Sequence, residues 1–137
     1  SGRNVNDSIP RFIAKKVVNL MRRNKILIKG AKALIMGITF KENISDIRNS
    51  KIPEIHKVLV KKGLEVDVYD PLADYNLVQK EYGISLTKFP TKYEAIILAV
   101  AHEEFFKNGL EKFKNPNGAI VYDIKSVLDI DLIDGRL

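Results

Sequence analysis

Two short apolar runs, at residues 33–38 and 95–100, constrain the fold of this chain more than any other feature. Neither run shows the alternation of apolar and polar residues that marks a strand with one face in water. Such runs are typical of strands in a parallel sheet that helices cover on both faces. Further strands are predicted at residues 65–69, 84–86 and 119–122, of which the run at 84–86 is the weakest.

Amphipathic segments separate the predicted strands. Apolar residues recur in them at helical spacing, which predicts helices at about residues 8–24, 50–62, 75–82 and 102–106. Asp7 or Ser8 is expected to cap the first helix, with Pro10 in its first turn. The alternation predicts an α/β fold, a Rossmann-like doubly wound parallel sheet of about five strands in the order 3-2-1-4-5, preceded by a helix outside the sheet unit. Residues 126–137 are expected to be short and irregularly helical.

Composition excludes several kinds of site. The 137 residues fit one domain with a hydrophobic core. The chain has no cysteine and only two histidines, which excludes disulfides, thiolate chemistry and a multi-histidine metal site. No apolar run is long enough to span a membrane and no signal-peptide pattern is present, so we expect a cytoplasmic protein. The net charge of +6 favours an anionic partner, although a solvated basic helix face would also explain it.

The segment GITFKENISDIRNS, residues 37–50, is unusually long for a connection between a strand and a helix, which normally takes about 2–6 residues. It follows the first predicted strand, so it lies at the edge of the sheet where open α/β folds bind ligands. Residues 101–103 and 123–125 are expected at the same edge. Lys41 and Lys125 would then converge on one crevice suited to a pyrophosphate, unless both are solvated loop residues.

Other candidate groups have simpler interpretations. The loop lacks the G-x-G-x-x-G pattern of a dinucleotide site, so Asp70 before Pro71 is interpreted as a turn residue rather than a ribose ligand. His102 is expected to cap a helix or pack a loop rather than act as a base. Asp46 and Arg48 can pair across a turn. No nucleophile, base and orienting group occur together, so the chain shows no complete active site of its own.

Several ordered motifs resemble one family. The segments GITFKENISDIRNSKIPEI and VDVYDPLAD resemble the C-terminal, UDP-binding domain of the UDP-glucose/GDP-mannose dehydrogenase family. ILAVAHEEF, YDIKSVLD and the terminal DGRL resemble its branch that acts on UDP-N-acetyl-hexosamines in capsule and O-antigen synthesis. GRNVNDSIP is similar to the end of the family's long central helix. The resemblance divides the chain into residues 1–30, a connector from the central domain, and residues 31–137, the UDP-sugar-binding domain.

The resemblance implies a part of an enzyme. Family members are NAD-dependent 6-dehydrogenases that make a UDP-uronic acid through a cysteine thioester. Without a cysteine or the glycine fingerprint, this chain looks like an excised, inactive C-terminal piece. Its expected partners are a UDP-sugar and the N-terminal and central domains of the same protein, which would bind most of the NAD and form a homodimer or higher oligomer. No metal, nucleic acid or membrane is expected.

The family's site residues correspond to four positions in this chain. The resemblance assigns Phe40, Lys41 and, more loosely, Lys125 to substrate binding, and Arg48 to a contact with NAD on another domain. The long loop would then close over a nucleotide sugar. The alternatives are a stand-alone, non-catalytic nucleotide-binding module and a nucleic-acid binder that uses the basic first helix.

Overall fold

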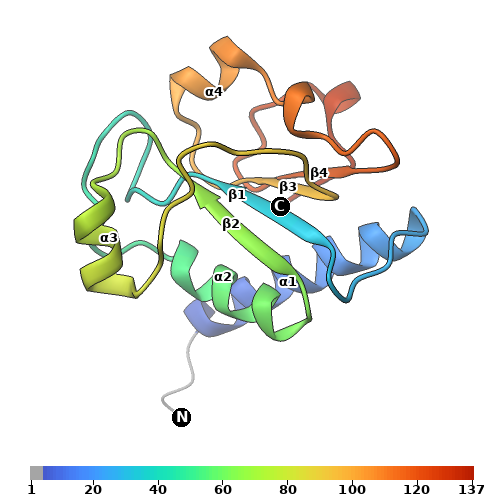
Figure 1. The fold of residues 1–137 in the computed structure, drawn as a ribbon, viewed down its shortest axis with the longest axis horizontal. Helices are drawn as coiled ribbons and strands as arrows, with labels where there is room; N and C mark the ends of the chain where they lie inside the picture. The colour runs from blue at the N-terminus through green and yellow to red at the C-terminus, as the bar shows by residue number, and fades with distance from the viewer. Residues whose placement is uncertain (1–4) are drawn as a thin grey trace.

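The computed structural model describes residues 5–137 as a five-stranded sheet with helices on both faces (Figure 1). The strand order is β2-β1-β3-β4-β5, and all neighbouring strands are parallel. The strands are β1 Lys32–Met36, β2 Glu65–Tyr69, β3 Ala95–Leu98, β4 Ile120–Asp123 and β5 Gly135–Arg136. The helices are α1 Val5–Arg23, α2 Ile52–Lys61, α3 Tyr75–Tyr82 and α4 Glu103–Asn108, with 3₁₀ turns η1 Glu111–Phe113 and η2 Ile130–Leu132. The predicted doubly wound α/β fold is confirmed.

The central strands are buried on both faces, as their apolar runs predicted. In β1, Ala33 and Ile35 belong to the core between the sheet and helices α1 and α2, whereas Leu34 and Met36 belong to the core on the side of α4 and η1. Figure 1 shows α1 and α2 below the sheet and α4 above it. Because successive side chains of a strand point to opposite faces, an unbroken apolar run is what a strand between two helical layers needs.

The prediction was wrong at the two edges of the sheet. Residues 84–86 form no strand. Just after them, the Thr87 amide donates to the Val68 carbonyl of β2 at 2.8 Å, but this single bond is not extended into strand pairing. The C-terminal tail, predicted to be irregularly helical, contains the short strand β5, which pairs with β4. The predicted order therefore holds for the four shared strands, and the fifth strand lies at the opposite edge from the one expected.

The first helix also differs from its prediction. It begins at Val5, so Pro10 lies in its second turn rather than its first. Residues 1–4, with part of the segment that resembles a central helix, lie outside the described residues, as does the predicted side-chain cap of Asp7. Ala14, Val17 and Met21 are fully buried against the sheet and α2. Whether residues 1–30 form a separate unit stays a prediction.

The carboxyl ends of the strands form the edge where sequence analysis placed the site. All strands run the same way, but the side on which successive strands join the sheet switches between β1 and β3, so the loops that follow these two strands diverge and leave space between them. At the end of β1, Gly37 lets the backbone pass close to Val100, which follows β3. Its φ is +105°, and a Cβ there would lie 2.5 Å from the Cβ of Val100. Among the described residues, no helix is long and apolar enough to cross a membrane.

Candidate functional site

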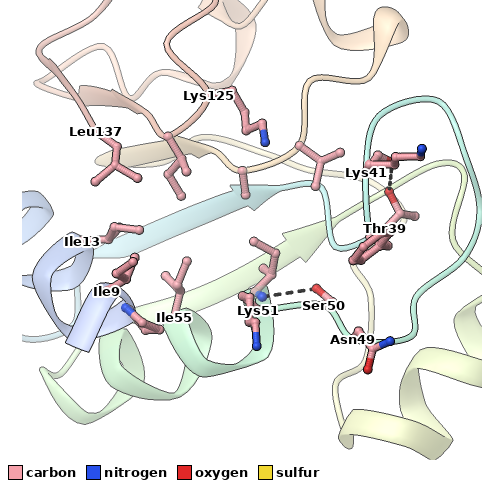
Figure 2. Close-up of a pocket in the computed structure, with 16 residues that line it drawn as sticks. Ile9, Ile13, Thr39, Lys41, Asn49, Ser50, Lys51, Ile55, Lys125 and Leu137 are labelled. Carbon is pink, nitrogen blue, oxygen red and sulfur yellow. Dashed lines mark hydrogen bonds between the residues drawn. The ribbon is translucent and has the colours of Figure 1, made fainter. Parts of the chain in front are cut away.

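A cavity of about 260 Å³ lies at the carboxyl edge of the sheet (Figure 2). The loop after β1, the start of α2, the loops after β3 and β4, the beginning of α1 and Leu137 all contribute to it. Its lining residues are Ile9, Pro10, Ile13, Thr39, Phe40, Lys41, Asn49, Ser50, Lys51, Ile52, Ile55, Ala99, Val100, Ile124, Lys125 and Leu137. The cavity therefore has an apolar floor from the helices and a polar rim from the loops.

The two predicted lysines lie on the rim of this one cavity. Lys41 comes from the loop after β1 and Lys125 from the loop after β4, 84 positions apart in numbering (125 minus 41). Figure 2 shows the Lys125 ammonium turned toward the side of the cavity where Lys41 lies, and the Lys41 ammonium turned outward. Within the described part of the chain, neither ammonium forms an ion pair. Both remain available to an anion.

The cavity has a positive lining. Lys51 adds a third cation, and none of the described residues that line the cavity is an aspartate or a glutamate. The predicted Phe40 is also present, with 56% of its surface exposed. An apolar floor beside several cations suits a ligand that combines an uncharged ring with phosphate groups.

Sequence reasoning missed Asn49, Ser50 and Lys51 as lining residues. They form the end of the long loop, directly before α2, and the Ser50 hydroxyl accepts a hydrogen bond from the Ile52 amide at 3.2 Å. Asn49 has a φ of +60°, which turns the chain into the helix. Their position could have been predicted to matter, because they directly precede a helix that starts at the ligand-binding edge, and helix N-termini favour anions.

Asp123 holds the loop that carries Lys125. It is fully buried at the end of β4, and its carboxylate accepts four backbone hydrogen bonds. Oδ1 accepts from the amides of residues 125 and 126 at 3.0 and 2.9 Å, and Oδ2 from those of 127 and 128 at 2.8 and 2.7 Å. The backbone at Lys125 is thereby fixed, while its side chain is exposed.

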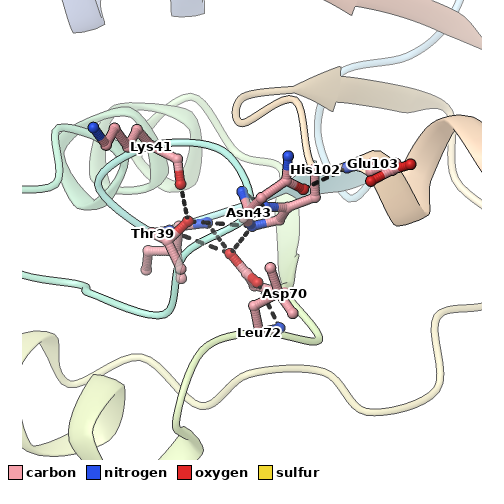
Figure 3. A network of polar contacts seen from close by, with 8 residues as sticks. Thr39, Lys41, Asn43, Asp70, Leu72, His102 and Glu103 are labelled. Carbon is pink, nitrogen blue, oxygen red and sulfur yellow. Dashed lines mark hydrogen bonds and ion pairs between the residues drawn. The ribbon is translucent and has the colours of Figure 1, made fainter.

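Asp70 is the centre of a buried polar network (Figure 3). Its Oδ2 accepts from the amides of Ile38 and Thr39 at 2.8 and 3.2 Å, and its Oδ1 accepts from the amide of Leu72 at 2.9 Å. His102 Nε2 lies 3.0 Å from Oδ2. Burial by itself would raise the pKa of Asp70, but the hydrogen bonds from His102 and the Ile38 amide outweigh it and lower that pKa. The turn interpretation holds, with a larger structural role than expected.

His102 packs the long loop, one of the two roles predicted for it. Its ring is fully buried, and Nδ1 accepts a hydrogen bond from the Asn43 amide at 2.9 Å. Its side chain does not cap α4. Asn43 does so instead, because its Oδ1 accepts from the Glu103 amide at 2.9 Å. The Thr39 hydroxyl lies 3.2 Å from Nε2 and donates to the Lys41 carbonyl at 2.9 Å.

Arg48 lies away from the cavity. It pairs with Asp46 through Nε–Oδ1 and Nη2–Oδ2 contacts of 3.0 and 2.9 Å, which confirms the predicted pair. Hydrogen bonds from the Arg48 side chain and amide lower the pKa of Asp46 to about 2. The Arg48 side chain is 80% exposed. Ile47, between the two, is buried, and its carbonyl accepts from the Tyr82 hydroxyl.

The described residues do not fit a dinucleotide site of their own. Gly37 faces Val100 instead of opening toward a phosphate, and it is the single glycine of the loop. Asp70, in the place of a ribose ligand, is already occupied by three amides and His102. The side chains that the structure describes, at residues 8–137, also include no group of three or more acidic or histidine side chains that could hold a metal ion.

Comparison with known proteins agrees with this geometry. A sequence model described as the UDP-glucose/GDP-mannose dehydrogenase family, UDP binding domain, matches residues 34–130. UDP-N-acetyl-D-glucosamine 6-dehydrogenase of Pseudomonas aeruginosa is 39% identical over 141 residues, covering 100% of this chain and 33% of the relative. The Salmonella typhi enzyme of the same name is 37% identical, again over 100% and 33%. The chain spans about a third of the length of these curated relatives.

Solved structures with the same fold include larger sugar-nucleotide dehydrogenases. An NDP-N-acetyl-D-galactosaminuronic acid dehydrogenase from Methanosarcina mazei superimposes with a TM-score of 0.77 at 20% identity, covering 92% of this chain and 27% of that one. A UDP-glucose dehydrogenase from Pyrobaculum islandicum superimposes with a TM-score of 0.70 at 23% identity, covering 96% and 29%. At these identities the likeness concerns the fold.

Proposed function

The chain belongs to the UDP-glucose/GDP-mannose dehydrogenase family, of which it contains the UDP-binding domain, and we propose that it binds the UDP-sugar of an NAD-dependent 6-dehydrogenase. The proposed substrate is a UDP-N-acetyl-hexosamine, with UDP-glucose as the alternative, and the product is a UDP-uronic acid for surface polysaccharide. The names of the relatives from Pseudomonas aeruginosa and Salmonella typhi support the hexosamine.

One observation carries the proposal: Lys41 and Lys125 reach the rim of the same cavity from two separate loops. Their ammonium groups would neutralise the pyrophosphate, and charge-assisted hydrogen bonds of this kind contribute about 1.5–3 kcal/mol each. Phe40 would pack against an uncharged part of the ligand, as its exposed ring suggests. The apolar floor below would exclude water from the bound nucleotide.

The redox chemistry belongs, in this proposal, to parts of the protein other than this chain. The chain contains no cysteine to form a thioester, and its loop does not fit NAD. NAD would be bound mainly by an N-terminal domain. Arg48, which projects from the exposed end of the loop, would reach that cofactor. The chain would pack against N-terminal and central domains of the same protein, in a cytoplasmic homodimer or higher oligomer.

Calorimetric titration of the chain with UDP tests the proposal. Lys41→Ala and Lys125→Ala each remove one cation from the cavity, so each should weaken UDP binding by about 10- to 100-fold. Lys62→Ala is the matched control. It removes the same charge at the end of α2, next to Gly63 and the amino edge of the sheet, and should change affinity less than about twofold.

Two results would contradict the proposed site. Equal weakening by all three variants would mean that UDP senses only the net charge of the chain. Binding that neither Lys41→Ala nor Lys125→Ala alters would place the nucleotide elsewhere. Turnover of a UDP-sugar with NAD by this chain alone would contradict the division of labour between domains.

A further inference from the structure

We propose that His102 is a positioning residue that holds the Lys41 loop in its ligand-binding conformation, and that only its neutral form can do so. This inference rests on the proposed function, because it assumes that Lys41 contacts the nucleotide. It concerns a side chain that is fully buried and does not line the cavity, so His102 would act through the loop and not on the substrate.

His102 joins three separate connections at the carboxyl edge of the sheet (Figure 3). It lies at the start of α4, after β3. It contacts Asp70, which follows β2, and it contacts Thr39 and Asn43 in the loop after β1. The Oδ1 of Asn43 in turn accepts a hydrogen bond from the Glu103 amide, in α4, at 2.9 Å. The long loop is thus attached on both sides of Lys41.

The hydrogen bonds determine where the proton of His102 resides. A backbone N–H can only donate, so the Asn43 amide requires an unprotonated Nδ1. The proton of the neutral ring is therefore on Nε2, which faces the Asp70 carboxylate at 3.0 Å. The Thr39 hydroxyl, also within reach of Nε2, already donates to the Lys41 carbonyl, so it can accept from the ring. Every polar atom in the network is satisfied in this one tautomer.

Protonation of Nδ1 would place two donors against each other. The Asn43 amide would lose its acceptor, and the backbone next to Lys41 would lose one of its attachments. Because the bond from the Asn43 amide exists only with an unprotonated Nδ1, release of the loop and protonation would be coupled. Asp70 is the charged side chain in contact with the ring. The other neighbours, Thr39 and Phe105, are neutral, and Glu103 and Glu104 follow on α4 with exposed side chains.

Asn43 has a left-handed backbone conformation, which its two hydrogen bonds help to hold. Its φ is +62°, a conformation that asparagine adopts more readily than most residues other than glycine, though still at a small cost. The bonds to His102 Nδ1 and to the Glu103 amide offset that cost in the closed loop. With the first bond lost, the loop has less to hold it in this conformation.

Two substitutions separate the two hydrogen bonds of the ring. In His102→Asn, the amide oxygen can take the place of Nδ1 and accept from Asn43, and the side chain cannot be protonated. In His102→Gln, the amide nitrogen can take the place of Nε2 and donate to Asp70, while the bond to Asn43 is lost. His56→Gln, on the half-buried side of α2, is the matched control for loss of a histidine.

The affinity for UDP-N-acetylglucosamine is measured by calorimetry at about pH 7.5 and at about pH 5.5. Each phosphate of this ligand has one ester bond and one anhydride bond and therefore a single, strongly acidic hydroxyl, so the charge of the ligand is the same at both pH values. The parent and His56→Gln should bind about five- to tenfold more weakly at the lower pH. His102→Asn should lose that pH dependence, and His102→Gln should bind about five- to tenfold more weakly at both.

Hydrogen exchange of the Asn43 amide, measured without ligand, keeps this test separate from the proposed function. Its protection factor should fall at low pH in the parent and at both pH values in His102→Gln. If protection changes in this way but the ligand does not bind, the attachment stands and the nucleotide site fails. Protection that is the same in the parent, in His102→Gln and at both pH values would overturn the proposal, as would equal pH dependence of affinity in His102→Asn and the parent.

Discussion

The two ends of the long loop are held by carboxylates in opposite ways. At the inner end, Asp70 is fully buried and binds Ile38, Thr39 and His102. At the outer end, Asp46 pairs with Arg48 in water. A buried carboxylate whose partners are all satisfied is costly to remove, whereas an exposed ion pair contributes little to stability. The inner end is thus built to fix Lys41, and the outer end leaves Arg48 free to exchange its partner.

Removal of the inner carboxylate should have the largest effect. Asp70→Ala leaves three backbone amides without an acceptor and removes the carboxylate that faces the His102 ring, which should lower the free energy of unfolding by about 3–5 kcal/mol. Urea denaturation followed by circular dichroism measures the loss. Asp46→Ala is the matched control at the outer end and should leave the midpoint nearly unchanged. Similar losses in both variants would remove the distinction between the two ends.

Gly37→Ala tests the point where the loop leaves β1. The new Cβ would lie 2.5 Å from the Val100 Cβ, in a backbone conformation that alanine disfavours, so stability should fall by about 2–3 kcal/mol. Gly83→Ala also has a positive φ, but nothing lies within 4 Å of its added Cβ. It should cost about 1 kcal/mol. The two variants are compared by thermal unfolding. An equal loss of stability would mean that the contact with Val100 does not contribute to the cost of Gly37→Ala.

Acid should remove the contribution of Asp70, at the inner end of the loop, to the free energy of unfolding. The pKa of Asp70 is lower in the folded chain than its ordinary value of 3.8, so the unfolded chain takes up this proton first. The contribution of Asp70 is therefore complete above about pH 4 and is lost as pH falls through its lowered folded pKa. Urea titrations between about pH 5 and 2 should show a steeper fall in stability for the parent than for Asp70→Ala. Parallel curves would contradict this role.

Arg48→Ala should have the smallest effect on this chain. Both partners of the pair are exposed, so the midpoint of unfolding and the affinity for UDP should stay within error of the parent. In a full-length protein the same substitution should weaken NAD binding or turnover, since Arg48 would act on a second domain. A marked loss of UDP affinity in the isolated chain would instead bring Arg48 into the nucleotide site.

The features that depend on local sequence patterns could be predicted, namely the buried central strands and the edge where the two lysines meet. The runs at residues 33–38 and 95–100 identified both-face burial, and strand order then brought Lys41 and Lys125 to one edge. The edge strands were mistaken because pairing there depends on partners far along the chain. β5 has only two residues, which are recognised as a strand because they pair with β4.

The buried network around Asp70 could not be predicted from local sequence patterns, because its partners are far apart along the chain. Asp70 and His102 are 32 positions apart, and His102 and Asn43 are 59 apart. The long loop was recognised, but the side chains that hold it lie in other segments. Asp123 was placed at the correct edge, yet its four backbone hydrogen bonds depend on a turn geometry that residue types alone do not reveal.

The most direct test is a map of UDP contacts on the chain by NMR. Backbone amide shifts of the ¹⁵N-labelled protein are followed as UDP is added. We predict that the largest changes occur at residues 39–41, 49–52 and 124–125, with Asp46 and Arg48 little affected. Changes concentrated instead in the basic groove between α1 and α2, around Arg11, Lys15 and Lys61, would show that UDP follows surface charge and would contradict the proposed nucleotide site.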